Sequence, residues 1–141
     1  TAQKTVAQTQ QQAPAPQASG SGQAAAGIAT SMLGNPYVWG GTAPGGFDCS
    51  GLIQYVYGQL GVSLPRTTGG QAGSGYSVGL GSLQAGDILL FSYNGGVDHV
   101  GIVTDSSGNF VHASTPSTGV CTGNVYDPWY KAVFVGARRI F

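Results

Sequence analysis

Charged side chains are scarce in this chain. Its 141 residues include five Lys or Arg and five Asp or Glu, which leaves no net charge at pH 7. Proteins that bind nucleic acid need a basic surface to neutralise phosphates, so this composition argues against that class of partner. Folding is still expected, because 41% of the residues are hydrophobic and can supply a core.

Long apolar runs are missing as well. No stretch approaches the roughly 18 consecutive apolar residues that a transmembrane helix requires, so the sequence predicts no membrane span. The N-terminus also lacks the charged start and apolar run of a signal peptide. If the protein is exported, we expect that its signal has been removed or that the chain is part of a longer precursor.

Aromatic residues are absent from the first 21 positions, which are rich in Gln, Ala and Pro. Such a segment buries too little apolar surface to offset the entropy of ordering it. We therefore predict a flexible tail or linker over residues 1–21 and a single folded domain over residues 22–141.

Two helices are predicted in the first half of that domain. Residues 23–33 are small and helix-compatible, and they stop before Gly34 and Pro36, which favour a helix end. A second helix begins at Cys49 and ends near Gly61, with Asp48 as its N-cap. Its apolar positions lie on one face at a helical period: Leu52, Ile53, Val56 and Leu60.

The second half of the chain has the period of strands. Residues 87–93, 99–104, 109–114 and 132–140 are predicted strands, and Gly-containing turns at 94–96 and 105–108 separate the first three. Strands joined by tight turns form antiparallel sheets. The sequence therefore predicts an α+β domain, with N-terminal helices packed on an antiparallel sheet.

Only two cysteines are present, Cys49 and Cys121. In an exported protein, two cysteines commonly form a disulfide, which is one interpretation. The other follows from the position of Cys49 at a helix N-terminus, where the helix dipole and free N–H groups favour a reactive thiolate.

Two histidines, His99 and His112, lie on consecutive predicted strands. Neighbouring antiparallel strands can bring them together, so that His99 serves as a base for Cys49 and His112 orients His99. The backbone N–H of Cys49 is then a candidate oxyanion donor. A zinc site built from these three residues and Cys121 is the alternative, but the sequence has no closely spaced pair of ligands.

Four further residues have simpler interpretations. We expect Trp39 to pack in the core and Asp98 to be a turn residue. Arg66 is interpreted as a surface or loop-fixing charge rather than a substrate contact. Tyr37 also suits a core position, although its hydroxyl could point into a site.

A set of short motifs, spread in order over residues 22–141, resembles the NlpC family of papain-like cell-wall endopeptidases. The motifs are YVWGG, GFDCSGL, LPRT, LQAGDILLF, DHVGIV, FVHAS and FVGARR. The resemblance implies a papain-like fold with the nucleophilic cysteine at a helix N-terminus. It also implies a secreted bacterial enzyme that hydrolyses peptidoglycan stem peptides, usually between γ-D-glutamate and a diamino acid such as diaminopimelate.

The same resemblance assigns roles to individual residues. It implies Cys49 as nucleophile, His99 as base and His112 as the third polar residue, with no metal or cofactor. Substrate contacts are implied for Tyr37, Asp48 and Ser50. Cys121 departs from the family pattern, so the resemblance predicts that Cys49 is not in a disulfide.

Two other functions stay open from the sequence. The domain could be a non-catalytic wall-binding module that retains the fold, or an acyltransferase or amidase that uses the same three residues. We expect a monomer whose partner is the peptidoglycan stem peptide.

Overall fold

The computed structural model describes residues 20–141, so the predicted tail lies outside the described residues up to position 19. The helices are α1 (Gly20–Ser31), α2 (Cys49–Gly58), α3 (Thr68–Gln71) and α4 (Pro128–Val133), with a 3-10 turn at Leu80–Ser82. The strands are β1 (Thr42–Ala43), β2 (Gly46–Phe47), β3 (Tyr76–Val78), β4 (Ile88–Phe91), β5 (His99–Val103), β6 (Asn109–Thr115), β7 (Gly119–Asn124) and β8 (Phe134–Arg139).

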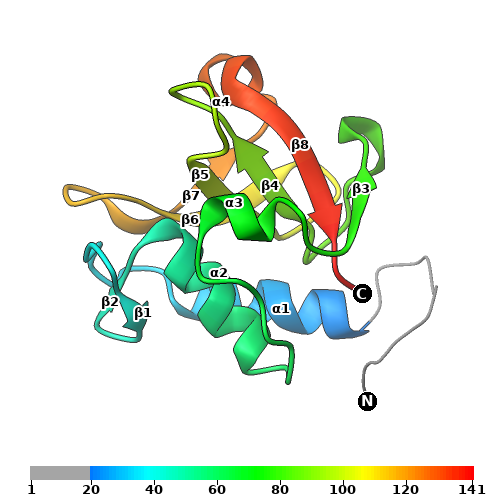
Figure 1. Cartoon of the computed structure of the whole chain (residues 1–141). Coiled ribbons are helices and arrows are strands. Elements are labelled where there is room, and N and C mark those ends of the chain that lie inside the picture. The colour runs from blue at the N-terminus through cyan, green and yellow to red at the C-terminus, as the bar shows by residue number, and fades with distance from the viewer. Residues whose placement is uncertain (1–19) are drawn as a thin grey trace.

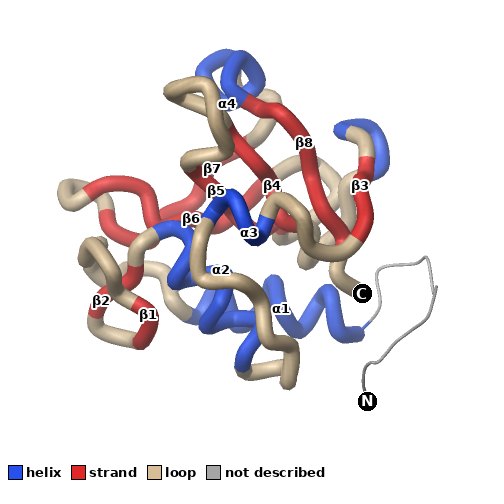
Figure 2. The backbone as a smooth tube through the Cα atoms, in the orientation of Figure 1, coloured by secondary structure: helices blue, strands red, loops and turns tan. Residues whose placement is uncertain are grey.

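Six of these strands form one sheet in the order β3-β8-β4-β5-β6-β7 (Figure 2). All of its pairings are antiparallel, which confirms the prediction. Helices α1 and α2 lie on one side of the sheet and α4 lies at the opposite end of the molecule (Figure 1). The small β1–β2 hairpin sits beside the start of α2.

The two faces of the sheet bury separate hydrophobic clusters because side chains alternate along each strand. On the first face, Leu90, Val100, Ile102 and Val111 pack with α1 and α2. The second face carries the other cluster, which includes α4: Leu89, Phe91, Val103, Phe110, Val125 and Ala137, with Tyr130 and Val133 packed against them.

Helix α2 forms where it was predicted. Asp48 has extended backbone angles and its side chain accepts from the N–H of Gly51, so it is the N-cap. Leu52, Ile53 and Val56 are fully buried, and the chain turns away at Gly61, whose φ is 82°. Helix α1 ends at Ser31, and Gly34 follows with φ 91°, as a helix end favours.

Several elements differ from the prediction. Residues 132–133 belong to α4 instead of a strand, and β3, β7 and the β1–β2 hairpin were not predicted. The expectation that Trp39 packs in the core is wrong, because its side chain is 86% exposed. Gly41 donates to the carbonyl of Val38 across a tight turn with Gly40 at φ 80°, and this turn leaves Trp39 at its tip.

Candidate active site

The site is built around the first turn of α2. Cys49 is the first residue of this helix, immediately after the Asp48 cap. Gly51 lets the helix start approach the preceding loop, since a Cβ there would lie 1.9 Å from the carbonyl oxygen of Gly41. The tight Val38–Gly41 turn is therefore held directly against the cysteine-bearing end of α2.

The sulfur of Cys49 lies at the beginning of β5. The backbone N–H of Val100 hydrogen-bonds to this sulfur, which brings Cys49 next to His99, the preceding residue. Burial raises the pKa of the Cys49 thiol, and the nearby Asp48 carboxylate adds to the rise. The expectation from sequence that the helix N-terminus lowers the pKa of Cys49 is therefore wrong for the substrate-free protein. The effect of burial on this pKa is larger than that of the N–H groups around the sulfur.

His99 is 5% exposed and is held between aromatic rings. Phe91 and Tyr93 contact it at ring-centroid distances of 5.8 and 5.6 Å, and Tyr93 is stacked on it. Its Nε2 atom lies 2.7 Å from Nδ1 of His112, so the predicted histidine pair forms. Because Nε2 faces His112, Nδ1 is the ring nitrogen of His99 that remains available to accept a proton from Cys49.

His112 is fully buried on the α4 side of the sheet. Its ring packs edge-on against Phe110, and its Nε2 lies 3.4 Å from the hydroxyl of Tyr130 on α4. Burial lowers the pKa of His99 to about 4, and burial together with His99 lowers the pKa of His112 to about 3. Both imidazoles are therefore neutral at pH 7.

Asp48 joins two loops to the first turn of α2. Its Oδ1 accepts from Gly51 N at 2.7 Å and its Oδ2 from Gly40 N at 3.0 Å. Arg66 donates to both oxygens, at 3.2 and 2.8 Å, and also to Ser50 Oγ at 2.8 Å. Burial alone would raise the pKa of Asp48, but the hydrogen bonds from Arg66 and Gly51 outweigh it and the pKa is lowered.

This network tests two sequence-based interpretations. Arg66 fixes the loop before α3 to the start of α2, so the interpretation of a loop-fixing charge is confirmed. Because the oxygens of Asp48 already accept from Arg66 and the backbone, a substrate amine would compete with Arg66 for them. The substrate contacts predicted for Asp48 and Ser50 stay predictions.

Tyr37 and Asp98 are two further residues that the sequence singled out near this centre. Tyr37 bridges to Phe47, and burial followed by the charges of Cys49 and Asp48 raises the pKa of its hydroxyl, which places that hydroxyl near Cys49. Asp98 accepts from the N–H groups of Tyr93 and Asn94, so its predicted role in the turn is confirmed.

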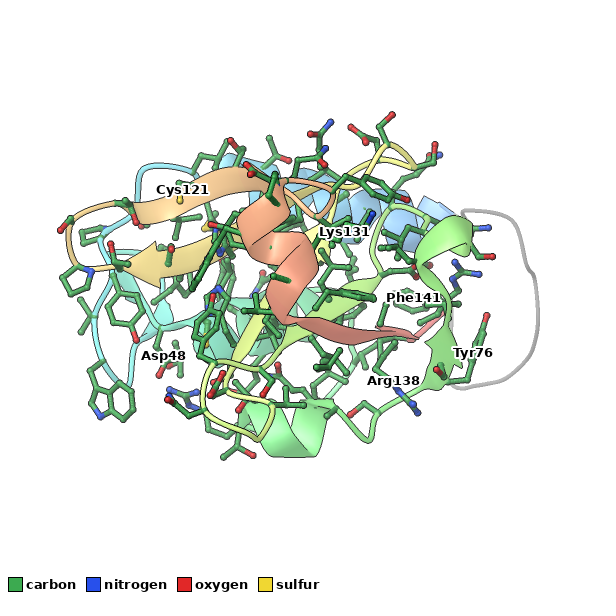
Figure 3. All side chains as sticks on the ribbon, turned by 90° about the horizontal axis from the view of Figure 1, so that it is seen from above. Asp48, Tyr76, Cys121, Lys131, Arg138 and Phe141 are labelled. Atoms are coloured by element: carbon green, nitrogen blue, oxygen red, sulfur yellow. The ribbon has the colours of Figure 1, made fainter. Side chains whose placement is uncertain are left out.

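Both cysteines are free thiols, so the disulfide interpretation is wrong. Cys121 on β7 is the direct cross-strand partner of His112. Among residues 20–141, no group of three or more His, Cys, Asp or Glu side chains could hold a metal ion, and the zinc interpretation gains no support. Figure 3 shows Cys121 and Asp48 at one end of the molecule, away from Tyr76 and Phe141.

Two aromatic residues of the site were not predicted. Tyr93 stacks on His99 and on Trp129, and Tyr130 reaches His112. Tyr93 ends the predicted strand 87–93, and Tyr130 follows Pro128 and Trp129 in loop-like sequence, so neither position indicated a contact with the histidines.

Comparison with known proteins decides the family. The sequence profile of the NlpC/P60 family matches residues 34–139, which is most of the chain. The chain belongs to the NlpC/P60 family. This confirms the resemblance, and the NlpC/P60 match covers every residue discussed in this site.

Similarity to individual proteins and solved structures supports the same family assignment. The chain is 43% identical over 123 residues to a probable endopeptidase of Corynebacterium glutamicum, covering 86% of this chain and 57% of the relative. It is 39% identical over 108 residues to the probable endopeptidase p60 of Listeria seeligeri, covering 77% of this chain and 20% of that protein. The chain thus spans little more than half of the first relative.

Among solved structures, the NlpC/p60 domain of the peptidoglycan hydrolase SagA matches with a TM-score of 0.75 and 36% identity. The alignment covers 84% of this chain and 98% of that domain. The predicted papain-like α+β fold is therefore confirmed for this NlpC/P60 domain. No helix within residues 20–141 combines the length and apolar character needed to cross a bilayer.

Proposed function

We propose that this NlpC/P60 domain is a cysteine endopeptidase that hydrolyses peptide bonds in peptidoglycan. The observation that carries the proposal is the contact between His99 Nε2 and His112 Nδ1 beside a free cysteine at a helix N-terminus. Support comes from its relatives, which are probable endopeptidases, and from a structural neighbour that is a peptidoglycan hydrolase.

The first half of the proposed reaction forms an acyl-enzyme. His99 Nδ1 takes the thiol proton of Cys49 as the sulfur attacks the carbonyl carbon of the scissile bond. The oxyanion that develops is stabilised by the backbone N–H of Cys49, in the first turn of α2. His99 then gives its proton to the leaving amine, the C–N bond breaks, and a thioester remains on Cys49.

The second half releases the product. Water replaces the amine, His99 removes a proton from it, and the resulting hydroxide attacks the thioester carbonyl. The C–S bond breaks, the thiolate regains the proton from His99, and a carboxylic acid leaves. In both halves His112 accepts from Nε2–H of His99 and holds the ring in the orientation that the transfers need.

We further propose the substrate and setting that the sequence resemblance implied. The bond is the one between γ-D-glutamate and diaminopimelate or a related diamino acid in stem peptides. Tyr37, Asp48 and Ser50 border the substrate site, and the domain acts as a secreted monomer in the bacterial wall. No metal or cofactor takes part.

A matched pair of cysteine variants tests the activity. Cys49→Ala removes the proposed nucleophile, whereas Cys121→Ala removes the other thiol. Purified muropeptides are incubated with each protein and the products are identified by mass spectrometry. We expect new fragments cut after γ-D-glutamate from wild type and Cys121→Ala, and none from Cys49→Ala.

Other results would select other functions. Undiminished hydrolysis by Cys49→Ala would overturn the proposed nucleophile. Retention of wild type on sacculi without any new fragment would indicate a wall-binding module. Transfer to an added amine in place of water would indicate an acyltransferase.

A further inference from the structure

Tyr130 contacts His112 from the side of the sheet opposite to α2. Its hydroxyl lies 3.4 Å from His112 Nε2. Its ring packs edge-on against His112 and Phe110, at centroid distances of 5.5 and 5.1 Å, and it also contacts Phe91. These contacts fix the place of the hydroxyl relative to the buried imidazole.

The histidine pair has two possible proton arrangements. Each neutral imidazole carries one proton, and the short contact between His99 Nε2 and His112 Nδ1 uses one of the two. If His99 Nε2–H donates, His99 Nδ1 is free to accept and His112 carries its proton on Nε2. If His112 Nδ1–H donates, His99 carries its proton on Nδ1 and has no free nitrogen for Cys49.

We propose that Tyr130 is a positioning residue whose hydroxyl oxygen accepts from His112 Nε2–H and thereby selects the first arrangement. This inference rests on the proposed function, because the first arrangement is the one in which His99 can take the thiol proton of Cys49. Ser114 is also hydrogen-bonded to the Tyr130 oxygen and acts to lower the pKa of Tyr130, as a hydroxyl that donates to this oxygen does, and the other lone pair of the oxygen is left for His112.

The arrangement also has a consequence during the reaction. When His99 gains the thiol proton, its Nε2–H becomes a stronger donor to His112 Nδ1. His112 Nε2–H in turn donates more strongly to Tyr130, so the chain of contacts spreads the new positive charge. Tyr130 does this without touching the substrate, from a helix outside the helix-and-strand pair that carries Cys49 and His99.

Tyr130→Phe removes one oxygen and keeps the packed ring. The control is Tyr126→Phe, since the Tyr126 hydroxyl donates to the carbonyl of Leu80, away from the histidines. Nitrogen NMR of protein labelled with 15N-histidine reports the tautomers directly, and the chain has only two histidines. Thermal melting shows that each variant is folded.

In wild type we expect the proton on Nε2 of both histidines at pH 7. In Tyr130→Phe we expect the ratio of the second arrangement to the first to rise by roughly tenfold, the effect of one hydrogen bond, and kcat to fall roughly 2- to 10-fold with KM within twofold. Tyr126→Phe should match wild type in both measurements.

Three results would overturn the inference: a wild-type His112 protonated on Nδ1, unchanged tautomers in Tyr130→Phe, or an unchanged kcat in that variant. The tautomers are measured without turnover. Failure of the proposed function is seen separately, as full activity of Cys49→Ala.

Discussion

Burial decides the charge state of the proposed catalytic residues. His99 and His112 are 5% and 0% exposed, and desolvation disfavours an imidazolium at either position. The same effect raises the pKa of the Cys49 thiol. The resting site therefore holds a thiol and neutral imidazoles, and charges develop only when the substrate carbonyl is attacked.

Alkylation of Cys49 tests this resting state. The pKa of Cys49 lies above its ordinary value although the charge of Arg66 interacts with it, and the pKa of His99 is about 4, so no imidazolium favours the thiolate between pH 5 and 8. We expect the rate of iodoacetamide labelling at Cys49 to rise about tenfold per pH unit from pH 6 to 8, as the thiolate fraction does. Peptide mapping separates this signal from Cys121.

The Cys121→Ala variant provides the control, because every labelled thiol in it is Cys49. A labelling rate that is already high and constant from pH 5 to 8 would contradict the prediction. It would show a thiolate–imidazolium pair in the resting enzyme.

At the scale of elements, β5 supplies three parts of the site within three residues. His99 is the proposed base, Val100 donates to the sulfur of Cys49, and Gly101 makes room for the residues behind them. A Cβ at Gly101 would lie 2.8 Å from the ring of Phe110 and 3.4 Å from Cβ of His112. The glycine therefore lets β6 place His112 beside His99.

Gly101→Ala tests this role of the strand. The added methyl must displace Phe110 or His112, so we expect a loss of roughly 1–3 kcal/mol in the free energy of unfolding. We also expect kcat to fall roughly tenfold or more, because the histidine contact is disturbed. Urea unfolding and muropeptide hydrolysis measure the two effects.

Gly96→Ala is the matched control in the β4–β5 loop. A Cβ at Gly96 would meet no atom within 4 Å, and its backbone is not in the left-handed region. If Gly101→Ala behaved like Gly96→Ala in both measurements, Gly101 would have no part in placing the histidines.

The periodic elements were the ones that sequence could predict. Helix α2 and the strands around His99 and His112 have regular apolar patterns, and their turns contain glycine. The candidate Cys49, His99 and His112 followed because helix starts and adjacent strands bring residues together in a known way.

The remaining features depend on contacts between distant segments. Arg66 and Asp48 are 18 positions apart in the sequence, and so are Tyr130 and His112. Neither contact is reflected in a periodic sequence pattern. The large apolar side chain of Trp39 predicts a core position, but the tight turn of its backbone leaves that side chain exposed. The raised pKa of Cys49 likewise follows from burial that sequence alone does not give.

At the scale of the whole molecule, the site needs both layers that cover the sheet. Helix α2 carries Cys49 on the face packed by α1, whereas α4 brings Tyr130 to the face that holds His112. Strand β5 lies between β4 and β6 within the sheet, and its first two residues, His99 and Val100, point to opposite faces. Loss of either layer should therefore affect the site, even where no site residue is removed.

Stepwise N-terminal deletions test this dependence on the layers. Residues 1–19 contain no aromatic residue and little apolar surface to bury, so we expect their removal to leave the free energy of unfolding and the activity unchanged. Removal of residues 1–31 also deletes α1, whose Ala25 and Ala29 are fully buried against the sheet and α2. The uncovered apolar surface should lower the free energy of unfolding by several kcal/mol, at about 25 cal/mol per Å² exposed, and increase binding of a hydrophobic dye.

Urea unfolding, dye fluorescence and muropeptide hydrolysis are compared for the two deletions and the full chain. A change in activity after removal of residues 1–19 would show that this segment acts on the site, as an inhibitory or substrate-guiding tail would. Unchanged stability after removal of residues 1–31 would show that α1 is dispensable. The position of Cys49 would then depend on α2 and the sheet alone.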